Sequence, residues 1–142
     1  MSRKTSRENA FKMIFAMITK GDERIPEGFY EEATDSEIWS GKEADEEDKS
    51  YIEKVCPGVC EKEAELDEII KKYLKNWTID RINRVCLAAL RLCIYEILYM
   101  DDIPLKVSAS EAVEIVKKYA GDEEGKFVNG LLGEYIRKEL EG

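Results

Sequence analysis

The chain has 142 residues, of which 44% are hydrophobic and 37% are charged; its formal net charge is −9 and it contains no histidine. This length is enough for one domain with a real core. The absence of histidine removes the commonest general base and metal ligand. The charge is unevenly spread, because residues 1–20 carry five basic side chains and one acidic one, whereas residues 21–68 carry 18 acidic and 5 basic ones. A basic end on an acidic protein therefore needs an explanation. No secretory signal segment and no run of about 20 apolar residues is found, so we expect a cytoplasmic protein that does not span a membrane.

Apolar residues spaced by three and four predict a helix over residues 7–18, preceded by a flexible basic tail. Cations near a helix N-terminus oppose the macrodipole by some tenths of a kcal/mol. This cost suggests that Arg3, Lys4 and Arg7 face an external anion.

Weaker signals follow in the acidic part of the chain. Residues 21–28 read as a loop and residues 29–39 as a short helix, and residues 41–50 are too polar to bury. The last stretch lacks the central glycine and terminal glutamate of a calcium-binding loop, so we interpret it as a solvated segment. A helix over residues 51–59 is expected to kink or end at Pro57 and Gly58. Residues 63–74 form the next amphipathic helix.

The centre of the chain is the most apolar stretch. Residues 77–100 predict one helix of about 24 residues, which would span some 35 Å. It is apolar on most sides, so other helices must cover it. Glu96 interrupts the apolar pattern. We interpret it as a partly buried carboxylate paired with a helix neighbour or with an arginine such as Arg91, with a catalytic role as the alternative.

The C-terminal part predicts two more helices. A turn at residues 101–104 is followed by Ser108 and Glu111, which match the capping box that begins a helix. That helix is expected to run to Tyr119 with this ring buried. A loop over residues 120–125 then leads to a last helix over residues 126–140. The chain is therefore predicted to be all-α, a single domain over residues 1–142 with six to seven helices.

The chemistry-bearing residues favour binding over catalysis. Cys56 and Cys60 could supply two metal ligands, but without a histidine or a second close cysteine pair we predict no metal site and no cofactor. Lys126 and Phe127 follow the glycine-containing loop, where a cation and a ring can hold a phosphate and stack on an unpaired base. The alternative for Phe127 is a position in the core. We do not expect an enzyme.

Four separated segments resemble the NusB family of transcription antitermination factors. They are Ser-Arg-Glu-Asn-Ala-Phe-Lys-Met-Ile-Phe at residues 6–15, Leu-Arg-Leu-Cys-Ile-Tyr-Glu-Ile at 90–97, the run from Ile-Pro-Leu-Lys to Lys-Lys-Tyr at 103–119, and Lys-Phe-Val-Asn-Gly-Leu-Leu at 126–132. The resemblance implies an all-helical fold of two small helical subdomains. It also implies binding of single-stranded boxA RNA from ribosomal-operon transcripts, together with the ribosomal protein NusE, within an RNA polymerase antitermination complex.

The resemblance also implies site residues. RNA contacts are expected from the basic N-terminus and from the loop before the last helix, at Arg3, Lys4, Arg7, Glu123, Lys126 and Phe127. The NusE-binding face is expected at Phe15, Asp80 and Arg81, and a homodimer through that face is a further expectation. This chain departs from the family at Cys86, where a glutamate is expected, and at Thr5 and Ser6, where other members are often basic.

Two other functions are weighed against this one. The first is a protein–protein adaptor module without direct RNA binding. The second is an RNA-modifying enzyme, because the domain also resembles the N-terminal module of some rRNA cytosine methyltransferases; the chain has no room for their cofactor-binding α/β domain. The RNA-binding hypothesis requires Arg7 and Phe127 to lie on the same side of the molecule.

Overall fold

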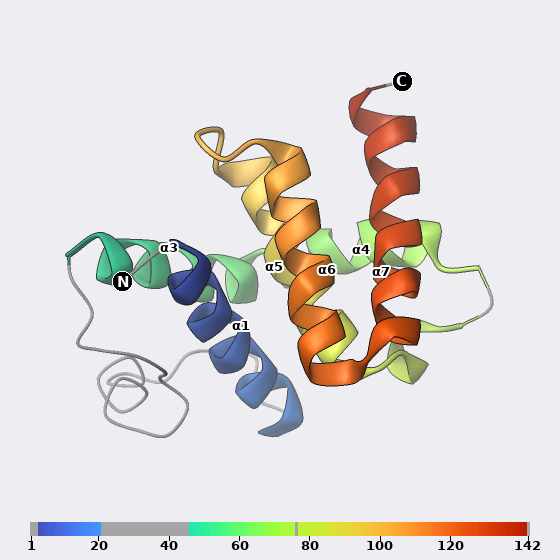
Figure 1. Ribbon diagram of the computed structural model, residues 1–142, viewed down its shortest axis with the longest axis horizontal. Coiled ribbons are helices and arrows are strands. Elements are labelled where there is room, and N and C mark those ends of the chain that lie inside the picture. Colours follow the sequence, from blue (N-terminus) through green and yellow to red (C-terminus); the bar gives the residue numbers. More distant parts are fainter. Residues whose placement is uncertain (1–2, 21–45, 76, 142) are drawn as a thin grey trace. The chain divides into compact units, whose positions relative to one another are not determined.

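The computed structural model describes residues 3–20, 46–75 and 77–141, and within these ranges the chain is helical and contains no strand. The predicted all-α class is confirmed. The chain forms two compact units, Met1–Glu61 and Lys62–Gly142, and each is described by itself (Figure 1). No helix in the described ranges has the length and apolar character needed to cross a membrane. That the two units make up a single domain stays a prediction.

The first unit consists of α1 (Arg3–Lys20) packed against α3 (Glu46–Glu61). Their contact is apolar and buries Ala10, Phe11, Met13, Ile14, Met17, Tyr51, Ile52, Val55, Cys56 and Val59. Helix α1 begins four residues earlier than predicted, so the basic N-terminal residues are helical from Arg3 and do not form a flexible tail. The predicted loop over 21–28, the helix over 29–39 and residues 41–45 of the acidic stretch lie outside the described residues.

Helix α3 does not end at Pro57 and Gly58 as predicted. It starts within the acidic stretch, at Glu46, and continues through Pro57 to Glu61. Proline removes one backbone donor from a helix, which weakens the helix without necessarily ending it. Because Val55, Cys56 and Val59 are all buried around it, packing against α1 compensates for that loss.

The second unit holds the remaining elements: α4 (Glu63–Tyr73), η1 (Ile79–Arg81), α5 (Arg84–Tyr99), α6 (Leu105–Ala120), α7 (Asp122–Tyr135) and a π-helical turn, η2 (Ile136–Leu140). Helices α5, α6 and α7 run up, down and up side by side (Figure 1), and α4 packs against both α5 and α7. As predicted, α5 is covered on most sides, since the ten residues from Cys86 to Glu96 other than Arg91 are buried. The core continues into the neighbouring helices through Leu66, Ile70, Ala112, Val116, Val128, Leu131, Leu132 and Tyr135.

Residues 77–100 do not form one continuous helix. A 3₁₀ turn at Ile79–Arg81 is followed by extended backbone at Ile82, and α5 begins only at Arg84. The side chain of Asn83 accepts a hydrogen bond from the backbone N–H of Val85 at 2.8 Å. Asparagine is among the strongest N-capping residues, so this bond sets the start of α5.

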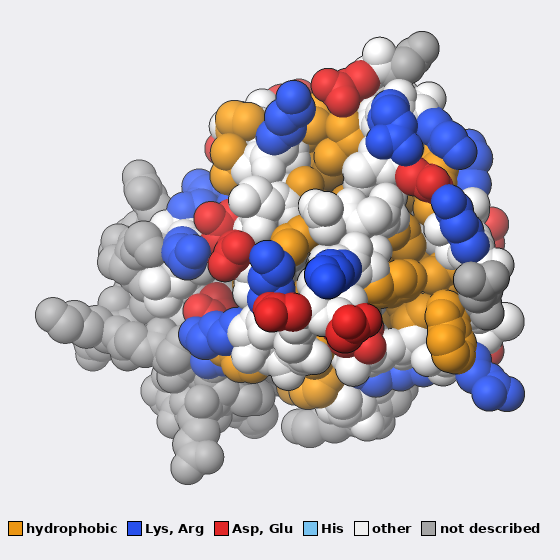
Figure 2. All heavy atoms as spheres, turned by 45° about the vertical axis from the view of Figure 1, so that its right-hand side comes forward, with side chains coloured by type: hydrophobic (Ala, Val, Ile, Leu, Met, Phe, Trp, Pro, Cys, Tyr) orange, Lys and Arg blue, Asp and Glu red, His pale blue; other side chains and the backbone are white. Residues whose placement is uncertain are grey.

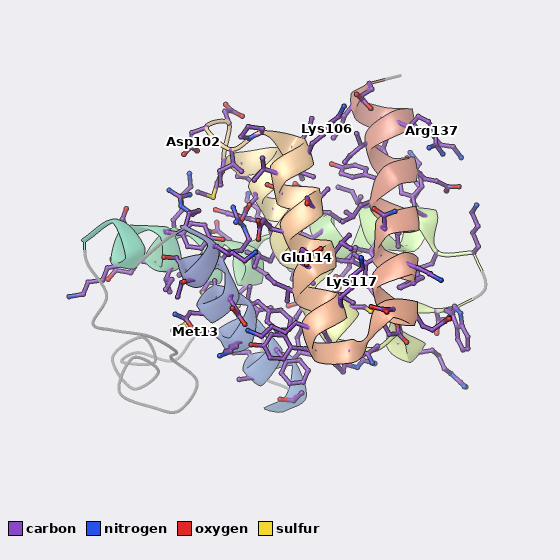
Figure 3. The ribbon with its side chains drawn as sticks, in the orientation of Figure 1. Met13, Asp102, Lys106, Glu114, Lys117 and Arg137 are labelled. Atoms are coloured by element: carbon purple, nitrogen blue, oxygen red, sulfur yellow. The ribbon has the colours of Figure 1, made fainter. Side chains whose placement is uncertain are left out.

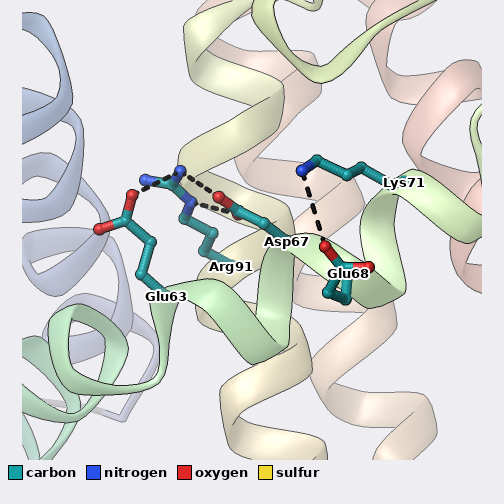
Figure 4. A network of polar contacts seen from close by, with 5 residues as sticks. All are labelled: Glu63, Asp67, Glu68, Lys71 and Arg91. Carbon is teal, nitrogen blue, oxygen red and sulfur yellow. Dashed lines mark hydrogen bonds and ion pairs between the residues drawn. The ribbon is translucent and has the colours of Figure 1, made fainter.

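The predicted capping box at Ser108 is wrong. Helix α6 begins at Leu105, directly after Pro104, and Ser108 lies inside it, 1% exposed. Its hydroxyl donates to Oε1 of Glu96 at 2.8 Å, and Glu96 is itself fully buried. Glu96 is therefore bonded to this serine, whereas Arg91 pairs with Asp67 and Glu63 of α4 (Figure 4). The predicted burial of Tyr119 is also wrong, because this ring is 39% exposed.

Helices α6 and α7 are joined by a single residue, Gly121, whose φ of 97° lies in the region that favours glycine. Helix α7 therefore begins at Asp122, four residues before the predicted start. The helices approach closely at the next glycine, since a Cβ on Gly125 would lie 2.5 Å from Cγ of Lys117. Figure 3 shows Lys117 on the side of α6 that faces α7.

Candidate nucleic-acid interface

The basic residues at the start of α1 differ in exposure. Arg3 and Lys4 are exposed, and the Arg3 guanidinium lies 4.9 Å from the centre of the Tyr51 ring on α3. A cation over an aromatic face is attracted by the ring quadrupole, which holds Arg3 at the surface of the first unit. Arg7 is only 4% exposed and has interaction partners within the protein. Arg3 and Lys4 are therefore the accessible cations at this end of the chain.

The predicted RNA-binding residues near the C-terminus all lie on α7. Glu123 and Lys126 are exposed, and Phe127 is partly buried. They belong to the first two turns of the helix, so the expectation that Lys126 and Phe127 follow a flexible loop is wrong. The turn before them is the single residue Gly121. Consequently the ring and the ammonium group are carried by a rigid helix, and Val128 occupies the core position beside them.

A first hollow opens beside Phe127. It has a volume of about 270 Å³ and lies between the first turns of α7 and the segment that leads into α5. Its lining residues are Trp77, Arg81, Ile82, Asn83, Glu123, Glu124 and Phe127. The structure thus brings two of the residues expected to contact RNA, Glu123 and Phe127, together with Arg81, which was expected to contact a protein partner.

A second hollow shares Trp77 and Phe127 with the first. Its volume is about 290 Å³ and its lining residues are Tyr73, Lys75, Trp77, Lys126, Phe127, Gly130, Leu131 and Glu134. Nζ of Lys75 lies 2.6 Å from Oε1 of Glu134. This hydrogen-bonded contact lowers the pKa of Glu134 below its usual value, so the carboxylate stays ionised beside the hollow.

Cys86, where the resemblance implied a glutamate, lies on α5 beside Glu124, one of the residues that line the first hollow. Its thiol is buried and lies 3.2 Å from Oε2 of Glu124, within hydrogen-bond distance for sulfur. Burial, followed by the contact with Glu124, raises the pKa of the Cys86 thiol, so it remains protonated and can donate to the carboxylate. The carboxylate beside Cys86 is that of Glu124, on α7.

The three residues expected to contact a protein partner fall in different units. Phe15 lies on α1, partly buried, with its ring 6.1 Å from that of Phe11. Asp80 and Arg81 form the exposed end of η1. The backbone carbonyl of Asp80 accepts a hydrogen bond from Arg84, which ties η1 to the first turn of α5. Each unit thus presents part of the predicted partner face.

The sequence reasoning missed Trp77 and Lys75. Trp77 was placed in the central helix, but it precedes η1 and its side chain is 61% exposed. It lines both hollows together with Phe127. The available signal was the stretch from Lys75 to Thr78, polar except for Trp77, which separates the amphipathic pattern of α4 from that of α5. In the described residues, no group of three or more cysteine or carboxylate side chains is arranged to hold a metal ion.

The fold and these surfaces define a class: an all-helical protein with aromatic hollows bordered by cations. The chain belongs to the NusB family, whose model matches residues 4–137. It is 40% identical to the transcription antitermination protein NusB of Acetivibrio thermocellus over 99% of this chain and 92% of that protein. It is 38% identical to the NusB protein of Clostridium botulinum strain Hall over 96% of this chain and all of that protein.

Solved structures agree. NusB of T. maritima superposes with a TM-score of 0.84 at 32% identity, covering 97% of this chain and 92% of that one. A crystal structure of the antitermination factors NusB and NusE in complex with dsRNA superposes with a TM-score of 0.79 at 29% identity, covering 95% and 96%. The family and the fold predicted from the sequence are therefore both confirmed.

Proposed function

We propose that this protein is a transcription antitermination factor that binds single-stranded boxA RNA of ribosomal-operon transcripts together with the ribosomal protein NusE. The observation that carries the proposal is membership of the NusB family over residues 4–137, joined to the likeness to a solved complex of NusB and NusE with dsRNA. The protein acts as an adaptor in the cytoplasm. It holds the RNA, and NusE completes the binding surface and links it to the RNA polymerase antitermination complex.

The RNA contacts are proposed to come from both units. In the second unit, Phe127 stacks on a base, Lys126 contacts a phosphate and Glu123 accepts a hydrogen bond from a base amino group. In the first unit, Arg3 and Lys4 are exposed and can reach phosphates. Arg7 stays in the proposed set with a smaller expected effect, because only 4% of it is exposed.

The partner surface is proposed to consist of Phe15 on the first unit and Asp80 and Arg81 on the second, and self-association is proposed to use the same surface. A net charge of −9 favours encounter with a basic ribosomal protein. Opposite charge speeds association more than it sets the final affinity.

The test is a gel shift of a boxA RNA with this protein alone, with NusE alone and with both, at low salt. The proposal predicts weak binding by the protein alone and a tighter ternary complex, because each component contributes part of the surface. A scrambled RNA of the same length should bind less tightly. If neither mixture binds RNA at low salt while the two proteins still associate, the chain is a protein–protein adaptor and the RNA proposal is wrong.

Phe127→Ala sharpens the test. Losing one stacked base should weaken RNA binding by about 1–3 kcal/mol. Thermal unfolding followed by circular dichroism is the control, since an early-melting variant with unchanged RNA affinity would assign the ring to the core.

Lys126→Gln should flatten the dependence of log K on log salt by roughly 0.7, as one phosphate contact on a single strand is lost. Lys106→Gln, which alters an exposed lysine at the start of α6 outside both hollows, is the matched control. An unchanged slope for Lys126→Gln would remove this lysine from the RNA contacts.

A further inference from the structure

Trp77 is exposed although the fold around it is well packed. Its side chain is 61% exposed, while the rings of Tyr73 and Tyr135 in the same unit are 7% and 2% exposed. Tryptophan carries one of the largest apolar surfaces of any side chain, so leaving it in water forgoes the stabilisation that burial would bring. Exposed tryptophans concentrate where a partner covers them. Trp77 is thus available for contact with a ligand.

The two hollows share this ring. Trp77 and Phe127 line both, so the pair forms a wall common to a hollow of about 270 Å³ and one of about 290 Å³. Both volumes fall just below the roughly 300–1,000 Å³ typical of small-molecule sites. Two adjacent small spaces with a shared aromatic wall suit two successive units of a polymer better than one compact ligand.

Each hollow also has its own cation. Arg81 lines the first and Lys126 the second, and neither makes an ion pair with any residue that the structure describes. Lys75 adds a second ammonium group to the second hollow; its partner Glu134 is 2.6 Å away, and the lysine side chain is 70% exposed. An ammonium group has three donors, so the exposed Lys75 can contact a ligand while it stays bonded to Glu134, whose side chain is 20% exposed. Figure 2 shows this side of the second unit, where a hydrophobic patch is bordered by Lys and Arg side chains.

We propose that Trp77 and Lys75 form a second nucleotide subsite beside Phe127, so that two successive unpaired bases of one RNA strand stack against the shared aromatic wall. The phosphate of the second nucleotide is held by Lys75 and Lys126. Glu134 accepts a hydrogen bond from the exocyclic amino group of the base, which favours adenine or cytosine over uracil. The inference rests on the proposed RNA-binding function and adds Trp77, Lys75 and the second hollow to it.

Tryptophan fluorescence tests the stacking directly. The chain has two tryptophans, and Trp39→Phe leaves Trp77 as the only one. Titration of that variant with a 12-nucleotide boxA RNA at low salt should quench and shift the emission, since a stacked base contacts the indole. In the parent protein, Trp77→Ala should raise Kd for the same RNA about 5- to 150-fold, the effect of one lost stacking contact. Tyr119→Ala removes another exposed ring of this unit that lines neither hollow, and should leave Kd unchanged.

A glycine pair on α7 allows the second hollow to be filled without damaging the fold. A Cβ at Gly130 or at Gly133 would meet nothing within 4 Å, but only Gly130 lines the hollow. Glutamine is a good helix former, so both Gly130→Gln and Gly133→Gln should preserve or raise the melting temperature. Only Gly130→Gln should weaken RNA binding, to an extent similar to that of Trp77→Ala. Equal RNA affinities for the two glutamine variants would overturn the subsite.

The outcomes separate this inference from the function on which it rests. RNA binding in a gel shift with unchanged Trp77 emission and an unaffected Trp77→Ala variant overturns the subsite and leaves the function standing. If Trp77→Ala weakens association with NusE but not RNA binding by the protein alone, the surface is a protein interface and the subsite is again overturned. If no RNA binds with or without NusE, both proposals fall.

Discussion

Arg91 of α5 forms ion pairs with two carboxylates of α4. Its Nε and Nη2 donate to the two carboxylate oxygens of Asp67, each at 2.8 Å, and Nη2 also lies 3.1 Å from Oε1 of Glu63 (Figure 4). The arginine side chain is 12% exposed and that of Asp67 is 17% exposed, so the pair is largely shielded from water. A planar, bidentate contact of this kind is specific to arginine.

Replacing Arg91 by lysine should lower the free energy of unfolding by about 1.5–3 kcal/mol. Lysine keeps the charge but offers one ammonium group to Asp67, so at least one of the two parallel bonds is lost, and hydrogen bonds to charged groups contribute about 1.5–3 kcal/mol each. Arg91→Ala should be worse, up to about 3–5 kcal/mol, because it leaves Asp67 and Glu63 close together without a cation.

Urea unfolding followed by circular dichroism measures the difference. Lys71→Ala is the matched control, because it removes an exposed ion pair on α4. Lys71 and Glu68 are 3.7 Å apart, with side chains 53% and 76% exposed (Figure 4). This exposed pair should contribute less than about 0.5 kcal/mol. If the free energy of unfolding of Arg91→Lys lies within about 0.5 kcal/mol of that of the parent protein, the reasoning from bidentate geometry is refuted.

Two further predictions concern single hydrogen bonds in the second unit. Ser108→Ala should lower the free energy of unfolding in urea by about 1.5–3 kcal/mol, because it removes a donor from the buried carboxylate of Glu96; a loss no larger than that of the exposed Ser110→Ala would count against it. The hydroxyl of Tyr73 donates to Glu139, which raises the pKa of Tyr73 to about 12. The stability from this contact should be complete below the unfolded pKa, near 10, and should fall as the pH rises through 12. In an absorbance titration, Tyr73→Phe should remove a tyrosine that ionises near 12, and loss of one that ionises near 10 would contradict the assignment.

The helices were predictable where apolar spacing and packing agree. Residues 63–74 and the buried part of α5 show continuous three- and four-residue spacing, and both are found as helices. The interruption before α5 was not predictable, because Ile82 and Val85 keep that spacing across it. The interruption depends on the side chain of Asn83 accepting a hydrogen bond from the backbone N–H of Val85, in the first turn of α5. The residue type alone does not show that this bond forms.

The capping-box error has a similar cause. Ser108 and Glu111 have the spacing of an N-terminal box, but the serine hydroxyl is bonded to Glu96, a residue 12 positions earlier. A buried carboxylate needs donors, and this tertiary demand outweighs the local pattern. Only the packing of α5 against α6 shows that the donor is available.

The candidate site was predictable in part. Glu123, Lys126 and Phe127 lie within two turns of one helix, so their proximity follows from helical spacing once α7 is assigned. Trp77 is 50 positions away from Phe127 in the chain, and only the arrangement of η1 beside α7 makes both line the same hollows. Long-range pairings of this kind are not encoded in local periodicity.

The backbone conformation of Gly121 determines how α7 places Phe127 in the two hollows. A single residue with φ 97° makes the entire connection between α6 and α7. This connection is too short to let α7 rotate about its own axis relative to α6. A residue inserted within the first turn of α7 would move Phe127 by about 100° around the helix axis, at 3.6 residues per turn, and carry it away from Trp77. Sequence change in this hairpin is therefore restricted by geometry.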